Sequence, residues 1–247
     1  MNTEFLTLVP GSIQTKVGDI ERAIGREVKV RRDSMGCYKG NNATPPLAVC
    51  VCDDRGNQRH VEIILSAQAV PHNLIHEILH AYRTVVLGVP RLVSPENRGS
   101  SLTEALENDA EHLFIVPEEM ALANEAKAFW EKQAGQHFDE LSDCLSSHGT
   151  VASELPAIRH GFLRHWLFVT RVLSDWPRRP ALRELLQRRS WQTAADTLVN
   201  ELANLSLDKV QVLRAYLRSG SLQLEKFRLR SWDPQRFGAV EDQIPLE

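Results

Sequence analysis

The chain has 247 residues, enough for one large domain or for a catalytic domain with an extension, since single domains usually span about 100–200 residues. Hydrophobic residues make up 43% and charged residues 25%, as in ordinary soluble globular proteins. The net charge of −3 gives no reason to expect nucleic acid or an anionic membrane as a partner.

The cysteines and the N-terminus bear on the cellular compartment. Four cysteines show neither the paired spacing of a zinc finger nor the density of a disulfide scaffold: Cys37, Cys50, Cys52 and Cys144. The N-terminus lacks the basic and apolar regions of a cleaved signal, and no apolar run approaches the roughly 18–20 residues of a membrane span. We therefore predict a cytoplasmic protein without membrane contact, with export by a route that needs no cleaved signal as the alternative.

Two helices and a small sheet are expected in the first third of the chain. Three stretches read as strands because they alternate polar and apolar residues or are apolar on both faces: 27–31, 47–52 and 60–65. The last two are expected to form a hairpin, since the residues between them are turn formers. Apolar residues at helical spacing predict a helix on either side of these strands: 13–24 and 70–87.

The second of these helices contains His76-Glu77-x-x-His80. Two histidines four residues apart project from neighbouring turns of one helix face, so both imidazoles can reach a single ion. The glutamate after the first histidine can address a water on that ion. This pattern predicts a zinc site in which His76 and His80 are ligands and Glu77 is the catalytic acid/base.

A catalytic zinc site needs three protein ligands and one open position, so a third ligand is expected on the next helix. That helix is predicted to begin at a capping box, Ser101-Leu102-Thr103-Glu104, and to end before Pro117. At about 100° per residue, Glu107 lies on the border of the apolar stripe and is the predicted third ligand, whereas Glu104 is expected to face solvent. The other candidates on this helix are Asp109, Glu111 and His112.

Several further polar residues near the motif are candidates for supporting roles. Glu111 could accept a hydrogen bond from a ligand histidine and so orient its ring. His72 is four residues before His76, but Pro71 places it in the first turn, where a capping or exposed role is expected. An oxyanion donor could come from one of four side chains: Tyr82, His112, His137 or His148.

The second half of the chain is expected to be mostly helical. Helical spacing predicts a long helix from Pro117 to about Cys144 and then three or four shorter ones, at about 156–174, 179–188, 191–203 and 207–217. Residues 222–230 alternate and are predicted to form a late strand, with a loop from Ser231 onward. We predict an α+β fold with two domains: residues 1–148, which carry the motif, and residues 149–247, a helical extension that recognises substrate or regulates.

The order of these features resembles a known group of enzymes. A His-Glu-x-x-His helix followed by an acidic helix is similar to the gluzincin metallopeptidases, and the order helix, small sheet, active helix, acidic helix resembles the ImmA/IrrE family over roughly residues 13–130. The stretch from Glu107 to Pro117 is similar to that family's acidic Glu-x-Glu-Ala-Asn-x-Phe helix and the apolar run to proline that follows it. The resemblance implies a zincin-like fold, with His76, His80 and Glu107 as ligands.

The predicted function is therefore that of a zinc-dependent metallopeptidase that cleaves a specific protein or peptide substrate. The resemblance implies a regulatory protease rather than a digestive one. Two alternatives use the same residues: a binding or regulatory protein that keeps the fold without turnover, and a toxin or effector with the same zinc chemistry. The sequence does not identify the substrate or the oligomeric state.

Overall fold

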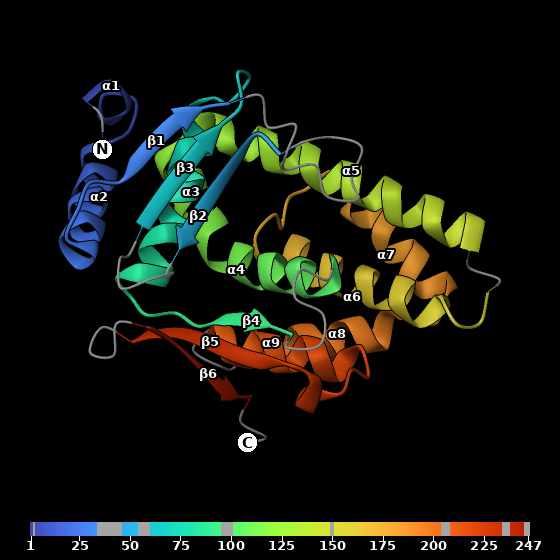
Figure 1. Cartoon of the computed structure of the whole chain (residues 1–247). Coiled ribbons are helices and arrows are strands. Elements are labelled where there is room, and N and C mark those ends of the chain that lie inside the picture. Colours follow the sequence, from blue (N-terminus) through green and yellow to red (C-terminus); the bar gives the residue numbers. More distant parts are fainter. Residues whose placement is uncertain are drawn as a thin grey trace.

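The computed structural model describes residues 1, 3–33, 46–53, 60–94, 101–148, 151–203, 208–233 and 238–244, and Figure 1 shows their arrangement. Cys37 lies outside these residues. The helices are α1 (Thr3–Leu6), α2 (Gly11–Ile24), α3 (Pro71–Val85), α4 (Ser101–Leu122), α5 (Asn124–His148), α6 (Leu155–Arg171), α7 (Arg179–Arg188), α8 (Gln192–Ala203), α9 (Lys209–Ser219) and the short 3-10 helix η2 (Leu224–Lys226). The strands are β1 (Lys29–Arg32), β2 (Ala48–Asp53), β3 (His60–Leu65), β4 (Arg91–Val93), β5 (Arg228–Asp233) and β6 (Gly238–Gln243). The predicted α+β class is confirmed at this coarse level.

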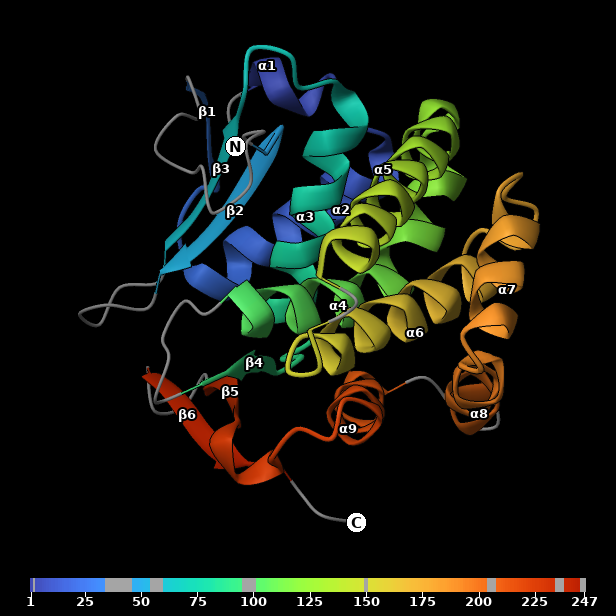
Figure 2. The ribbon, with the colours of Figure 1, turned by 90° about the vertical axis from the view of Figure 1, so that its right-hand side faces the viewer.

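The first sheet has the strand order β1-β3-β2. Strand β2 runs antiparallel to β3, with Cys50 opposite Ile63, so the predicted hairpin is confirmed. Strand β1 lies on the other side of β3 and runs parallel to it. Helices α2 and α3 pack on one face of this sheet (Figure 2), where Val30 and Ile63 are buried in the core. The edge strand β2 crosses over the helix that carries the motif.

A second sheet joins the two halves of the chain. Strand β4 pairs antiparallel with β5, with Leu92 opposite Leu229, and β5 pairs with β6. The predicted strand over 222–230 begins later, at Arg228, and the predicted loop from Ser231 is wrong, because β5 runs to Asp233 and β6 follows. Strand β5 pairs with β4, which is distant in the sequence, and local alternation does not reveal such a partner.

Helix α4 continues through Pro117 to Leu122, whereas the sequence predicted an end before this proline. Proline removes one backbone hydrogen bond and crowds the preceding turn, a cost of about 3 kcal/mol in a helix interior. Burial of Val116 and Glu119 on either side of Pro117 holds the helix together in spite of that cost. As a result, Glu119 lies on the same face as His112, two turns further along α4, since an α-helix has about 3.6 residues per turn.

The four shorter helices predicted for the second half correspond to α6, α7, α8 and α9. They pack against the first half, because α6 lies on α5 and α9 lies on α4. Phe162 of α6 and Tyr216 of α9 are completely buried in the same core as α3 and the first sheet. The core and the second sheet therefore each contain residues from both sides of the predicted boundary near residue 148. None of the helices described here is long and apolar enough to cross a membrane.

Candidate metal centre

Helix α3 is oriented by its buried face. Four aliphatic side chains on it are at most 2% exposed and face the sheet and α2: Leu74, Ile75, Ile78 and Leu79. Pro71 stands in the first turn, and the Asn73 side chain accepts a hydrogen bond from the Val70 backbone N–H at 3.0 Å, which fixes where the helix begins. This packing leaves His76 and His80 on the side of α3 that faces α4.

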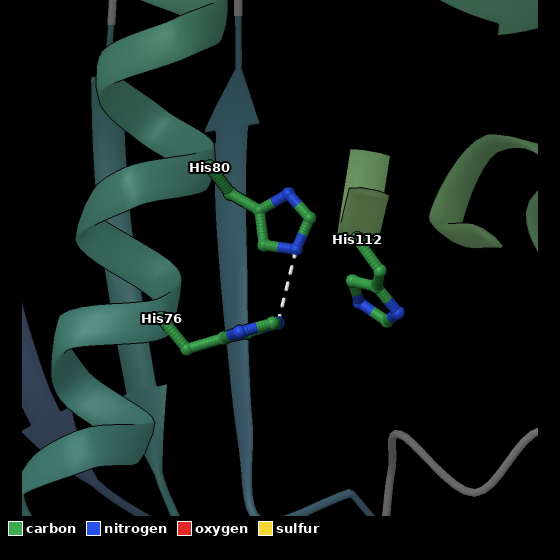
Figure 3. A group of neighbouring side chains, drawn as sticks. All are labelled: His76, His80 and His112. Atoms are coloured by element: carbon green, nitrogen blue, oxygen red, sulfur yellow. Dashed lines mark hydrogen bonds between the residues drawn. The ribbon is translucent and has the colours of Figure 1, made fainter. Parts of the chain in front are cut away.

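Three histidines converge between α3 and α4 (Figure 3). The Nε2 atoms of His76 and His80 are 3.1 Å apart. The ring of His112 on α4 lies opposite them, with its centroid 5.1 Å from that of His76 and 5.8 Å from that of His80. One nitrogen from each ring lies within 4.8 Å of the other two. These three side chains could therefore hold one metal ion.

The rings of His80 and His112 are in the form that binds a metal. Burial, and then the nearby His76, lower the pKa of His112 to about 3. The same two causes, in the same order, place the pKa of His80 well below its usual value. Both imidazoles are therefore neutral at physiological pH, so each has a nitrogen lone pair to offer.

Glu119 orients the His76 ring through Nδ1, the ring nitrogen that does not face His80. Its carboxylate has no exposed surface and accepts hydrogen bonds from Nδ1 of His72 at 2.8 Å, Nδ1 of His76 at 2.8 Å and Nε1 of Trp130 at 3.0 Å. Burial opposes ionisation of Glu119, but the hydrogen bonds from His72 and His76 outweigh it and lower the pKa to about 2. Burial lowers the pKa of His76, but the Glu119 hydrogen bond and the nearby carboxylates outweigh it and raise the pKa above its usual value. In the neutral ring, a proton on Nδ1 leaves Nε2 free to face the other two histidines.

Glu77 lies about 100° around α3 from His76 and points toward the first sheet. It is 8% exposed, and its carboxylate accepts a hydrogen bond from the backbone N–H of Cys50 on β2. Burial raises the pKa of Glu77, while the charge of His76 and the Cys50 hydrogen bond act in the opposite direction. The predicted acid/base therefore lies between the histidines and the edge strand of the sheet.

Glu107, the predicted third ligand, is not part of the histidine group. Its Oε2 accepts a hydrogen bond from the Leu92 backbone N–H at 2.7 Å, and its Oε1 lies 2.5 Å from Nζ of Lys209. Five residues of α-helix separate Glu107 from His112, so at about 100° per residue the two side chains point about 140° apart. Only one of them can face α3, and in the structure that residue is His112.

The other acidic candidates on α4 also have partners away from the histidines. Glu111 pairs with Arg83 and lies 2.6 Å from Nζ of Lys209, so it does not orient a ligand histidine; Glu119 does. Asp109 pairs with Arg164. Glu104 is exposed, as predicted.

The remaining predicted residues fall in different places. His72 is 2% exposed and bonded to Glu119, so the expected capping or exposed role is wrong. The Tyr82 ring lies under Lys16, with Nζ 4.0 Å from its centroid. His148 is exposed and pairs with Glu154 at 3.1 Å. His137 lines a pocket beside His112.

Comparisons with models of known protein families, with curated proteins and with solved structures found no match to this chain. The fold and the site thus define an α+β protein whose three-histidine group could hold a metal ion.

Proposed function

We propose that this protein is a zinc-dependent metallopeptidase in which His76, His80 and His112 hold the metal and Glu77 is the catalytic acid/base. The observation that carries the proposal is the convergence of three imidazoles from two helices, with the glutamate of the His-Glu-x-x-His motif buried beside them. Three histidines form an established ligand set for catalytic zinc, which leaves the fourth position for water or substrate.

The spacing of the nitrogens supports zinc. Zinc to nitrogen distances of about 2.0–2.1 Å in a tetrahedral site place neighbouring ligand nitrogens roughly 3.3 Å apart. The His76 and His80 nitrogens, at 3.1 Å, are already close to this spacing. A modest rotation of the His112 ring, whose nitrogen lies within 4.8 Å of the others, would complete the set. The orienting Glu119 carboxylate is typical of protein zinc sites.

The surroundings of Glu77 support peptide hydrolysis. A bound zinc ion would polarise a scissile carbonyl and lower the pKa of water. Glu77 would take a proton from the attacking water and deliver it to the leaving amine. Strand β2, which contacts Glu77 through Cys50, lies at the edge of its sheet, and an exposed edge can pair with an extended peptide. The substrate is therefore proposed to be a protein or peptide.

The proposal differs from the gluzincin pattern in one respect, since a histidine takes the place expected for a glutamate. The His-Glu-x-x-His helix under a small sheet remains consistent with a zincin-like arrangement, and we keep that arrangement as part of the proposal. The two rival readings, a non-catalytic binding protein and a toxin or effector, share the same zinc site.

Glu77→Gln tests the enzymatic part of the proposal. The variant keeps the shape of the side chain but removes its basicity, so it should retain about one zinc per chain and lose about 10²–10⁴-fold in hydrolysis of a proteome-derived peptide library. Glu104→Gln, on an exposed glutamate of α4, is the matched control and should behave like wild type. Equal hydrolysis by Glu77→Gln and wild type would contradict the catalytic role of Glu77, and a zinc-loaded wild type that cleaves nothing would favour the non-catalytic reading.

A further inference from the structure

Strand β2 carries two free cysteines beside the proposed site. Cys50 and Cys52 are two residues apart on this strand, so their side chains lie on the same face of the sheet. Their Sγ atoms are 3.6 Å apart and therefore in contact. Two thiols that touch within one strand can be joined by a disulfide without any partner from another part of the chain.

The pair lies where a small oxidant can reach it. Strand β2 is at the edge of the first sheet, and Cys50 and Cys52 are both partly exposed. The residues opposite them on β3, Ile63 and Val61, are in contrast buried. The thiols are thus among the more accessible side chains of this sheet that face α3.

The two thiols differ in their readiness to react. The hydrogen bond from Cys50 lowers the pKa of Cys52, burial opposes this effect, and the charge of Arg91 supports it. The same contact and burial raise the pKa of Cys50 well above its usual value. Because the thiolate is the nucleophile, Cys52 is the thiol that attacks an oxidant and Cys50 the thiol that resolves the product.

The strand geometry allows a disulfide between these residues but strains it. At about 3.3 Å per residue, the Cα atoms of Cys50 and Cys52 are about 6.6 Å apart, near the upper end of the roughly 4.4–6.8 Å range of disulfides. Their Cβ atoms, which have a similar spacing on the strand, must approach to about 3.8 Å. The strand therefore has to bend at Val51. A strained disulfide is easily reduced, so this one suits reversible formation.

A bend at Val51 would act on the proposed acid/base. The backbone N–H of Cys50 donates a hydrogen bond to the Glu77 carboxylate. Oxidation that draws Cys50 toward Cys52 moves this N–H and weakens the bond that positions Glu77. The redox state of the pair is thereby linked to the site between β2 and α3.

We propose that Cys50 and Cys52 form a reversible dithiol–disulfide couple that is oxidised by a hydroperoxide, and that the disulfide lowers hydrolysis at the adjoining site. The Cys52 thiolate attacks one peroxide oxygen, so that an S–O bond forms and the O–O bond breaks, and the leaving oxygen takes up the proton released by the thiol. The Cys50 sulfur then attacks the sulfenic sulfur: the S–S bond forms, the S–O bond breaks, and water leaves with the Cys50 proton.

The electrons balance, since the two sulfurs together lose two electrons and the peroxide gains them. Two equivalents of a small thiol reverse the reaction by thiol–disulfide exchange. The effect on hydrolysis rests on the proposed function, but the formation of the disulfide does not.

Peptide mapping of the full-length protein tests the couple without any hydrolysis assay. Trypsin cuts after Lys39 and Arg55, so Cys50 and Cys52 are released in one peptide that contains neither of the other cysteines. After treatment with a dose of hydrogen peroxide that only begins to oxidise the exposed Cys144, and then with an alkylating agent, this peptide should be lighter by two hydrogens and carry no alkyl label. Treatment with reduced glutathione before alkylation should restore both labels.

Variants identify the residues involved. Cys52→Ser should prevent the loss of two hydrogens, and Cys144→Ser, at an exposed cysteine, should behave like wild type. The wild-type map decides the matter even if Cys52→Ser does not fold. A peptide that keeps both alkyl labels while Cys144 is oxidised, one that gains oxygen atoms instead of losing hydrogens, or a disulfide from Cys50 to a cysteine outside the peptide overturns the proposal.

Hydrolysis assays separate this inference from the proposed function. Hydrolysis of a proteome-derived peptide library by zinc-loaded wild type should fall several-fold after peroxide and recover with reduced glutathione, whereas Cys52→Ser should keep its own rate under peroxide. An uncut library together with formation of the disulfide would refute the peptidase and leave the couple standing. A library cut equally by the reduced and the oxidised protein would refute the regulatory role while supporting the peptidase.

Discussion

The Nδ1 atom of His76 lies 2.8 Å from Oε2 of Glu119, a carboxylate that comes from another helix and has no exposed surface. The same carboxylate accepts hydrogen bonds from His72 and Trp130, so a single buried glutamate holds the ring of a proposed ligand and one wall of the adjoining pocket. The proposed metal site therefore depends on α4 twice, through His112 and through Glu119.

Replacement of Glu119 by glutamine should weaken zinc binding about 10–100-fold, because a carboxylate partner fixes the tautomer of a ligand histidine and raises its basicity. Competition with a chromophoric chelator measures this affinity. Glu118→Gln is the matched control, since its side chain is next in the sequence but 43% exposed. Affinities of Glu119→Gln and wild type that agree within twofold would contradict the orienting role.

The third ligand can be identified by comparing two substitutions on α4. His112→Ala should lower the zinc content of the purified protein well below one equivalent, because only two ligands would remain. Glu107→Gln should keep a full equivalent, since Lys209 and Leu92 engage its carboxylate away from the histidines. Metal analysis after gel filtration measures both. The opposite result, with zinc lost only from Glu107→Gln, would restore the original prediction.

The parts of the site that the sequence predicts are those set by local spacing. His76, Glu77 and His80 lie within two turns of one helix, so helical geometry alone indicates how they are placed. The choice between Glu107 and His112 depends instead on which face of α4 meets α3. That face is determined partly by Lys209, which is 102 residues from Glu107 along the chain and pairs with it in the core. Helical periodicity places both Glu107 and His112 near the edge of an apolar stripe. It does not reveal a partner as distant in the sequence as Lys209.

The same limit explains the errors in the fold. The hairpin of β2 and β3 and the helices α6 to α9 follow from local patterns and were predicted. Strand β4 was not, because its three residues form a strand only by pairing with β5, as Leu92 does with Leu229. Glu119 was assigned to a separate helix because Pro117 is a strong local signal for a helix end, and burial on both sides of the proline overrides that signal.

Lys209 should be important for stability rather than for chemistry. Its side chain is 3% exposed, and Nζ lies 2.5 Å from Glu107 and 2.6 Å from Glu111. Lys209→Met would remove the cation that both buried carboxylates share, a type of change that costs about 3–5 kcal/mol. Chemical denaturation of the metal-free protein measures the free energy of unfolding.

A matched control for this prediction is Lys127→Met, which removes a lysine that pairs with Asp175 at the surface and should change the free energy of unfolding little. Adding Glu107→Gln to Lys209→Met should recover part of the lost stability, because one buried charge is then gone. A Lys209→Met protein as stable as wild type would show that the two buried carboxylates are stabilised well enough without Lys209. Their remaining partners are Arg83 for Glu111, and Arg91 and the Leu92 backbone for Glu107.

His160 should make the protein less stable in mild acid. Burial and the nearby Arg164 lower the pKa of His160 to about 3, against the opposing effect of a hydrogen bond to the Tyr216 backbone. The unfolded chain, with a histidine pKa of about 6.5, binds a proton between these two values while the folded protein does not. The free energy of unfolding should therefore fall as pH decreases from about 6.5 toward 3, by up to about 1.4 kcal/mol per pH unit from this group.

His160→Asn keeps a side-chain donor near Tyr216 but does not titrate, so its stability should fall less steeply than that of wild type when urea denaturation is followed across this range. His148→Asn, at an exposed position, should follow the wild-type slope. Parallel slopes for wild type and His160→Asn would mean that the His160 ring is already protonated, or that it is as easily protonated in the folded protein as in the unfolded chain.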